Sequence, residues 1–238
     1  MKRFSLLVAA LSVTALFAAL GMWQLDRAAQ KRDMSAEFER RGNTAEVDLN
    51  QAGVNHSAAL AGRRTAAAGR YRDASILLDN QVLQGRAGYL VYTVFELNGR
   101  NESVLVNRGW IPANAERGHA PEFNTPSVSQ RLEGRLSPPP QAGLHLEGSE
   151  VIEQLADGMW RVQVIDFAAL TATVGGELLR MTVLLDVDAP YGFVRAWTPP
   201  GSNENRHLGY AFQWFALAVT VVIVTLVVTL RSGTAGTP

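Results

Sequence analysis

Two long runs without a charged side chain lie near the two ends of the chain. The first covers residues 4–22, FSLLVAALSVTALFAALGM, and the second covers residues 208–230. At a rise of about 1.5 Å per residue, each run makes roughly 30 Å of helix, which matches the hydrocarbon core of a bilayer. The pattern therefore predicts two transmembrane helices.

Each run has an alternative interpretation. Lys2 and Arg3, the apolar stretch and the triplet Ala19-Leu20-Gly21 are also consistent with a cleaved signal peptide. The run is longer than a usual signal-peptide core and helix formers follow it, so we favour a retained span. The second run could be a buried core helix, but it is apolar on all sides, which is typical of a membrane span.

Between the two runs, the pattern changes from helix to strands. Residues 23–41 contain no Pro or Gly and carry charges of both signs, which predicts that the first span continues as a helical stalk. Asn98-Gly99 is typical of a β-hairpin turn, and Asp166 and Gly175 are expected to cap a short helix. Short runs rich in β-forming residues cover 65–71, 75–80, 89–97, 103–112, 129–137, 160–166 and 178–187.

The predicted architecture is an α+β membrane protein. N- and C-terminal transmembrane helices flank one β-rich extramembrane domain with a few short helices. The predicted segments are an N-terminus at 1–3, a span at 4–22, the domain at 23–207, a span at 208–230 and a tail at 231–238. Lysine and arginine are nearly balanced beside both spans, so charge alone leaves the orientation open.

Composition removes several classes of function. The 22 basic and 22 acidic residues cancel without a basic block, so no nucleic-acid partner is predicted. The absence of cysteine excludes disulfides, thiolate metal sites and covalent c-type haem attachment. The chain contains no nucleotide-binding loop, nucleophile elbow or zinc-protease motif, and His56, His119 and His145 stand alone in irregular segments. We therefore expect that the chain is not an enzyme.

The candidate site lies where the second apolar run begins. His207, Tyr210 and Trp214 fall one helical turn apart and share a stripe of the helix. Such a stripe is either an interfacial aromatic belt or a membrane-surface site in which an imidazole binds a haem iron and aromatic rings pack on the porphyrin. One side of the other helix is predicted to carry Trp23, Gln24, Arg27 and Lys31. The cations Arg27 and Lys31 could meet porphyrin carboxylates or lipid head groups there. The residues alone leave both alternatives open.

The segment NRGWIP carries a second expectation. The pattern predicts that a strand ends at Val106, that Gly109 permits a turn, and that Trp110 folds back over the sheet or onto a partner. For Arg108, the sequence allows either a charge that faces a partner or a salt bridge within the domain.

Four segments, in this order, resemble the signature segments of the Surfeit locus protein 1 family. They are GMWQLDRAAQK, LLDNQVLQGRAGYLVYTVFEL, VLVNRGWIP and RHLGYAFQWFALA. Two positions depart from the family pattern, since Val94 replaces a proline and Gln213 replaces a threonine. The resemblance implies an assembly factor for cytochrome c oxidase that binds haem a and assists its insertion into the catalytic subunit. The implied partners are the membrane, cytochrome c oxidase subunit I and, as a further candidate, a haem a synthase.

The resemblance also implies a site and a location. His207 is the expected axial ligand of the haem iron, and Tyr210, Trp214, Arg27 and Trp23 are the expected haem-binding neighbours. Haem a would be transient cargo, and the domain would face the periplasm from a bacterial inner membrane. Two alternatives stay open: a scaffold for oxidase subunits that does not bind haem, and a membrane-tethered hydrolase, for which the sequence offers no nucleophile and base close together.

Overall fold

Two long helices hold the apolar runs. The computed structural model describes residues 2–51, 58–114, 116, 118–140, 152–197 and 201–234. Helix α1 (Lys2–Gly42) contains both the predicted span and the predicted stalk, and α3 (Glu204–Thr234) contains the second run. Only 6% and 11% of their most apolar stretches are buried, which contradicts a buried core helix for the second run and supports two membrane spans. The chain divides into two compact units, one with most of α1 and α3 and one with residues 38–197.

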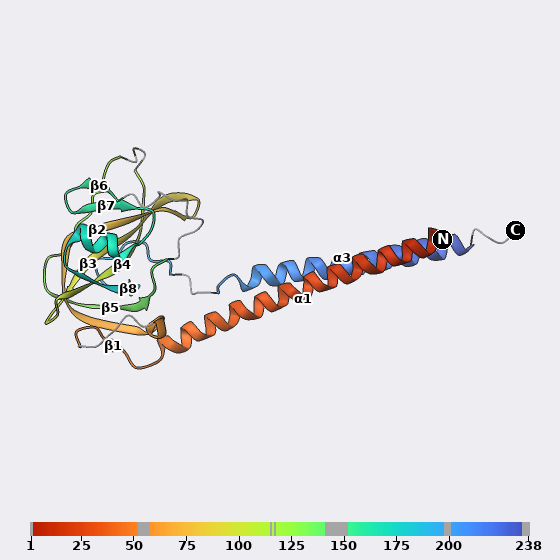
Figure 1. The fold of residues 1–238 in the computed structure, drawn as a ribbon, viewed down its shortest axis with the longest axis horizontal. Helices are drawn as coiled ribbons and strands as arrows, with labels where there is room; N and C mark the ends of the chain where they lie inside the picture. Colours follow the sequence, from red (N-terminus) through yellow and green to blue (C-terminus); the bar gives the residue numbers. More distant parts are fainter. Residues whose placement is uncertain are drawn as a thin grey trace. The chain divides into compact units, whose positions relative to one another are not determined.

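The second unit is the predicted β-rich domain. Its elements in chain order are β1 (Val47–Asp48), η1 (Ala58–Leu60), β2 (Arg64–Leu83), β3 (Arg86–Leu97), β4 (Glu102–Pro112), β5 (Gln130–Ser137), β6 (Glu153–Ala156), β7 (Met159–Val162), α2 (Phe167–Val174) and β8 (Glu177–Leu185) (Figure 1). The α+β fold class predicted from the sequence is therefore confirmed.

Five strands of this domain close into a barrel. The hydrogen-bonded order is β2, β3, β4, β8 and β5, and β5 pairs again with β2. Strands β4 and β8 are parallel, and the other four pairs are antiparallel. This is the five-stranded Greek-key arrangement of an OB-type barrel. The arrangement defines the fold and does not by itself assign a function.

Strand β2 is long enough to pair with different strands along its length. Its first part pairs with β5 and its second part pairs with β7, while β3 follows it on the other side. At Gly69, in the first part, a Cβ atom would lie 1.9 Å from the carbonyl oxygen of Glu96 on β3. Glycine is therefore required there by the close approach of the two backbones. The sequence predicted two separate strands in this region. In the structure they form the single strand β2, with an irregularity in its pairing with β3 between Tyr71 and Ser75.

Alternating side chains separate the inside of the barrel from its outside. One buried cluster takes residues from all five barrel strands, and in it the rings of Tyr71 and Phe95 meet edge to face at 5.0 Å. A second cluster packs α2 and β7 against the outer face of β2, β3 and β4, with Leu170 fully buried. The helix α2 begins and ends as predicted, since Asp166 accepts the amide of Ala168 and Gly175 adopts a φ of 71°.

The NRGWIP segment differs from the sequence expectation. Strand β4 does not end at Val106 but continues to Pro112, because Gly109, at a φ of 116°, forms an irregularity in the pairing with β3 rather than a turn. Trp110 is 8% exposed and its indole N–H donates to the carbonyl of Gln81 at 3.0 Å. Trp110 is therefore a buried core residue, as one of the two expectations had it, but it lies within strand β4 and does not fold back over the sheet.

Arg108 is neither exposed to a partner nor paired with a carboxylate among the residues that the structure describes, so both expectations for it were wrong. It is 1% exposed. Its Nε donates to the carbonyl of Tyr191 at 2.9 Å and its Nη2 to that of Asn124 at 3.0 Å. Burial lowers the pKa of the guanidinium. Three rings surround the charge at 5.3, 5.8 and 4.8 Å, those of Tyr71, Phe123 and Phe193.

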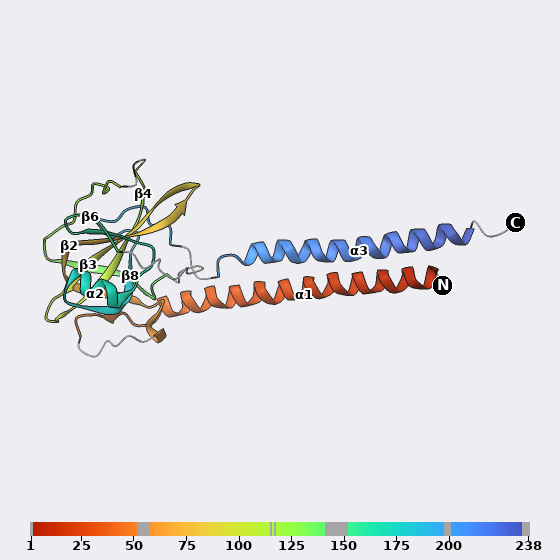
Figure 2. The same cartoon turned by 45° about the horizontal axis from the view of Figure 1, so that its top comes forward.

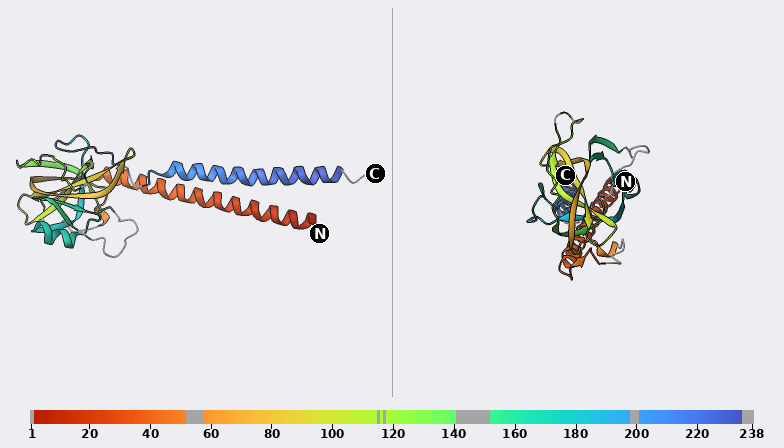
Figure 3. Two further views of the ribbon diagram at one scale, coloured as in Figure 1. Left: turned by 90° about the horizontal axis from the view of Figure 1, so that it is seen from above. Right: turned by 90° about the vertical axis from the view of Figure 1, so that its left-hand side faces the viewer.

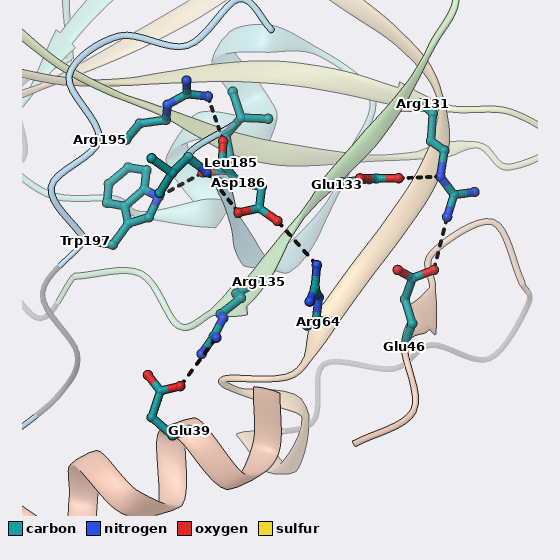
Figure 4. A network of polar contacts seen from close by, with 11 residues as sticks. Glu39, Glu46, Arg64, Arg131, Glu133, Arg135, Leu185, Asp186, Arg195 and Trp197 are labelled. Atoms are coloured by element: carbon teal, nitrogen blue, oxygen red, sulfur yellow. Dashed lines mark hydrogen bonds and ion pairs between the residues drawn. The ribbon is translucent and has the colours of Figure 1, made fainter. Parts of the chain in front are cut away.

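The ends of the domain are anchored on the barrel. Figure 4 shows that Arg135 on β5 meets Glu39 near the end of α1 at 3.6 Å, and that Arg64 meets Asp186 at 3.6 Å. On the segment that leads toward α3, the indole of Trp197 donates to the carbonyl of Leu185 at 2.8 Å. Each exposed ion pair is worth little alone. Together with the buried bonds they hold the first and last segments of the domain on strands β5 and β8.

Candidate functional site

The candidate site belongs to the unit formed by α1 and α3, which run antiparallel and side by side (Figure 2 and the left panel of Figure 3). Less exposed residues recur along both helices at alternating intervals of three and four, which is the spacing of a coiled-coil seam. On α1 they are Ala10, Thr14, Phe17, Gly21, Gln24, Ala28, Lys31 and Ser35, and on α3 they are Glu204, His207, Ala211, Trp214, Ala218, Val221 and Thr225.

Small residues bring the two backbones close together. Gly21 and Ala28 on α1 and Ala211 and Ala218 on α3 are buried. A Cβ atom on Gly21 would lie 2.7 Å from the ring of Phe215, so a larger residue there would separate the helices. Small residues at such positions are typical of helix pairs in membranes, where close packing replaces the hydrophobic effect as the source of association.

Three contacts define the register of the pair. His207 Nδ1 lies 2.8 Å from Gln24 Oε1. The ring of Trp214 packs against that of Phe17, with centroids 5.6 Å apart. Nearer the polar ends, Arg32 and the partly buried Glu204 form an ion pair at 3.7 Å. The histidine at the head of α3 is therefore tied to the end of the uncharged run on α1.

Nδ1 of His207 has a hydrogen-bond partner, and Nε2 has none among the residues that the structure describes. Gln24, its partner, is only 9% exposed, and its neighbours along the seam are Gly21 and Ala28. When Nδ1 carries the proton it donates to Gln24, and Nε2 keeps a lone pair that can bind a metal ion. The described residues contain no group of three or more histidine, aspartate or glutamate side chains that could hold a metal.

The other predicted residues lie on one flank of the helix pair. Arg27 immediately precedes the buried Ala28, and Tyr210 immediately precedes the buried Ala211, so they hold equivalent positions beside the seam. In an antiparallel pair, equivalent positions of the two helices lie on the same side. Trp23 is one turn from Arg27, whose guanidinium lies 5.6 Å from the centre of the Trp23 ring. The structure thus brings Trp23, Arg27 and Tyr210 to one side of the pair.

The aromatic residues differ in how much of each side chain is exposed. Trp23 is 49% and Tyr210 is 45% exposed, so both side chains lie at the surface of the helix pair. Trp214 is half-buried against Phe17 in the seam. Arg27 also donates to Gln30 at 3.1 Å.

The sequence indicated that His207 lies at the start of the second apolar run, but it did not indicate that Gln24 is the hydrogen-bond partner of His207. The signal was present in the spacing, because Gln24 is a polar residue three positions after Gly21 and four before Ala28. Of the isolated histidines, His119 is exposed beside Glu116 at 3.1 Å, whereas His56 and His145 lie outside the described residues.

The fold and the helix pair together define a membrane-anchored protein with an extramembrane β-barrel domain. The model of the SURF1 family matches residues 11–219, and the chain belongs to that family. This confirms the resemblance found in the sequence. Membership implies association with a membrane and a role in the assembly of cytochrome c oxidase, and it fits the expectation of a non-enzymatic role.

Two relatives show how far the similarity extends. A SURF1-like protein of Monosiga brevicollis is 26% identical over 236 residues, which cover 90% of this chain and 84% of that protein. A SURF1-like protein of Caenorhabditis elegans is 25% identical over 169 residues, which cover 68% of this chain and 46% of that protein.

Proposed function

We propose that this assembly factor holds haem a through His207 and assists its insertion into the catalytic subunit of cytochrome c oxidase. The observation that carries the proposal is the partly buried His207, which has Nδ1 engaged by Gln24 and Nε2 available, beside a flank with a cation and two exposed aromatic rings. A haem requires an axial ligand, apolar faces and partners for its propionates, and these residues can provide all three.

The residues divide this work by their chemistry. The imidazole of His207 would hold the iron, and the rings of Trp23 and Tyr210 would exclude water from the porphyrin. The guanidinium of Arg27 is exposed and can turn from Gln30 to donate two parallel hydrogen bonds to a propionate. Trp214 packs against Phe17 in the seam and would support the helix pair beside the porphyrin. The haem itself supplies the redox-active iron and the visible absorption.

A single protein ligand suits a carrier better than a resident haem site. Transfer to another protein requires that the complex dissociates readily, and one imidazole at the surface of a helix pair gives a moderate affinity. The two helices are antiparallel, so the end of the α1 run and the head of α3 lie on one face of the membrane. We place this face, with the domain, in the periplasm of a bacterial inner membrane, where subunit I and a haem a synthase are the candidate partners.

The proposal is tested on the full chain purified from cells that synthesise haem a. We expect the purified protein to carry the absorption bands of haem a, and we expect His207→Ala to lose them because the iron loses its ligand. His119→Ala is the matched control, since His119 is exposed in the domain, and it should leave the spectrum unchanged. A colourless wild-type protein that still copurifies with subunit I would refute the carrier function and would indicate a scaffold that does not bind haem.

A further inference from the structure

The side chain of Gln24 ends in an amide, whereas its neighbours in the seam on α1 are small residues. It is 9% exposed, and Gly21 and Ala28, its neighbours in the seam, are also buried. A buried amide that lacks a hydrogen-bond partner is costly, and an apolar residue of similar size would pack without that cost. The Gln24 side chain meets Nδ1 of His207 at 2.8 Å. This contact gives the amide a partner and gives the histidine a fixed environment.

The atom that faces the ring determines which imidazole tautomer is stable. Gln24 presents its carbonyl oxygen, which can only accept a hydrogen bond. The tautomer protonated at Nδ1 donates to this oxygen. The tautomer protonated at Nε2 would instead place the Nδ1 lone pair against the oxygen, which is repulsive. The arrangement therefore favours a proton on Nδ1 and a free lone pair on Nε2.

We infer that Gln24 is a positioning residue that holds His207 in the tautomer protonated at Nδ1 and so reserves Nε2 for the iron. The part that concerns iron rests on the proposed function, whereas the choice of tautomer does not. Histidines that bind metals commonly donate their second N–H to a carbonyl or carboxylate, and loss of that partner costs about 10–100-fold in affinity. A neutral amide accepts more weakly than a carboxylate, so it orients the ring while leaving the ligand weaker, which suits cargo that must be released.

The tautomer can be measured without haem. The full chain is labelled with ¹⁵N-histidine, placed in detergent micelles at an alkaline pH where the imidazole is neutral, and examined by NMR, with His207→Ala to assign the signals. We expect Nδ1 of His207 to have the shift of a protonated nitrogen and Nε2 that of an unprotonated one. In Gln24→Leu the preference should be lost. A proton on Nε2 in the wild-type protein would overturn the inference, because the amide would then be donating to Nδ1.

The effect on the ligand is measured by titration of each variant with haem a. We expect Gln24→Leu to bind about 10–100-fold more weakly. Gln24→Glu should bind haem a more tightly than the wild type and lower the reduction potential of the bound haem, because a carboxylate makes the imidazole a stronger donor. Gln213→Leu is the matched control, since Gln213 is an exposed glutamine on α3, and it should bind like the wild type.

The two proposals fail in different ways. If the wild-type protein does not bind haem a through His207, the proposed function fails, and the NMR shifts still decide whether Gln24 sets the tautomer. If haem a binds through His207 but Gln24→Leu matches the wild type in tautomer and affinity, the role of Gln24 is refuted and the carrier function stands.

Discussion

Replacement of Arg108 by alanine should destabilise the barrel domain strongly. The side chain is 1% exposed and donates to two loop carbonyls, those of Tyr191 and Asn124, at 2.9 and 3.0 Å. Its removal leaves both part-buried carbonyls without a charged donor, at about 1–2 kcal/mol each. The cavity between three aromatic rings adds roughly 2 kcal/mol. Relief of the buried charge returns part of this sum. We therefore expect a net loss of about 3–5 kcal/mol in the free energy of unfolding.

The measurement is urea unfolding of the full chain in detergent, followed by the fluorescence of the domain tryptophans such as Trp110. Arg108→Lys keeps the charge but loses the planar fork and its stacking, so it should fall between the wild type and alanine. Arg70→Ala is the surface control, because Arg70 is exposed in its ion pair with Glu96, and it should change the stability by no more than about 0.5 kcal/mol. A loss below about 1 kcal/mol for Arg108→Ala would refute the role of Arg108 as a buried link between the loops and β4.

Two further predictions concern the same domain. Gly69→Ala places a Cβ atom 1.9 Å from the Glu96 carbonyl oxygen and should cost more than about 2 kcal/mol in the free energy of unfolding. Gly118→Ala is the control in the same urea assay, because its Cβ atom would meet no atom of the described residues within 4 Å. Equal midpoints for the two variants would contradict the close approach at Gly69. Burial raises the pKa of Tyr71 to about 12, above the value of about 10 expected in the unfolded chain. The folded state thus holds this proton more tightly, and its contribution to stability is complete below about pH 10 and is lost as the pH rises toward 12. Urea midpoints measured across this range should fall less steeply in Tyr71→Phe, and equal slopes would contradict the pKa shift.

The sequence predicted the elements whose signals are local. Two uncharged runs, the Asn98-Gly99 turn and the caps Asp166 and Gly175 all depend on neighbouring residues, and the structure has each of them where the pattern placed it. The edge strand β6 was missed, because its four residues, EQLA, carry little β-forming character and are shaped by pairing with β7. The closure of the barrel depends on pairings between residues far apart in the chain, which periodicity does not record.

The environment of Arg108 shows why some side chains could not be predicted. A charged residue after a strand is usually exposed or paired with a carboxylate. Here the partners come from two distant loops, and the surrounding rings come from β2 and from both loops. No pattern near Arg108 indicates this arrangement. The sequence grouped Gln24 with Trp23 and Arg27 on one side of the helix, whereas the structure buries Gln24 against His207 and leaves Trp23 exposed.

The most direct test of the central claim is a spectral titration of the purified full chain with haem a, compared between the wild-type protein and His207→Ala. Our account predicts saturable binding, with a spectrum of an imidazole-ligated haem, and loss of that spectrum in His207→Ala. Identical binding curves and spectra for the two proteins would show that His207 does not hold the iron and would contradict the account.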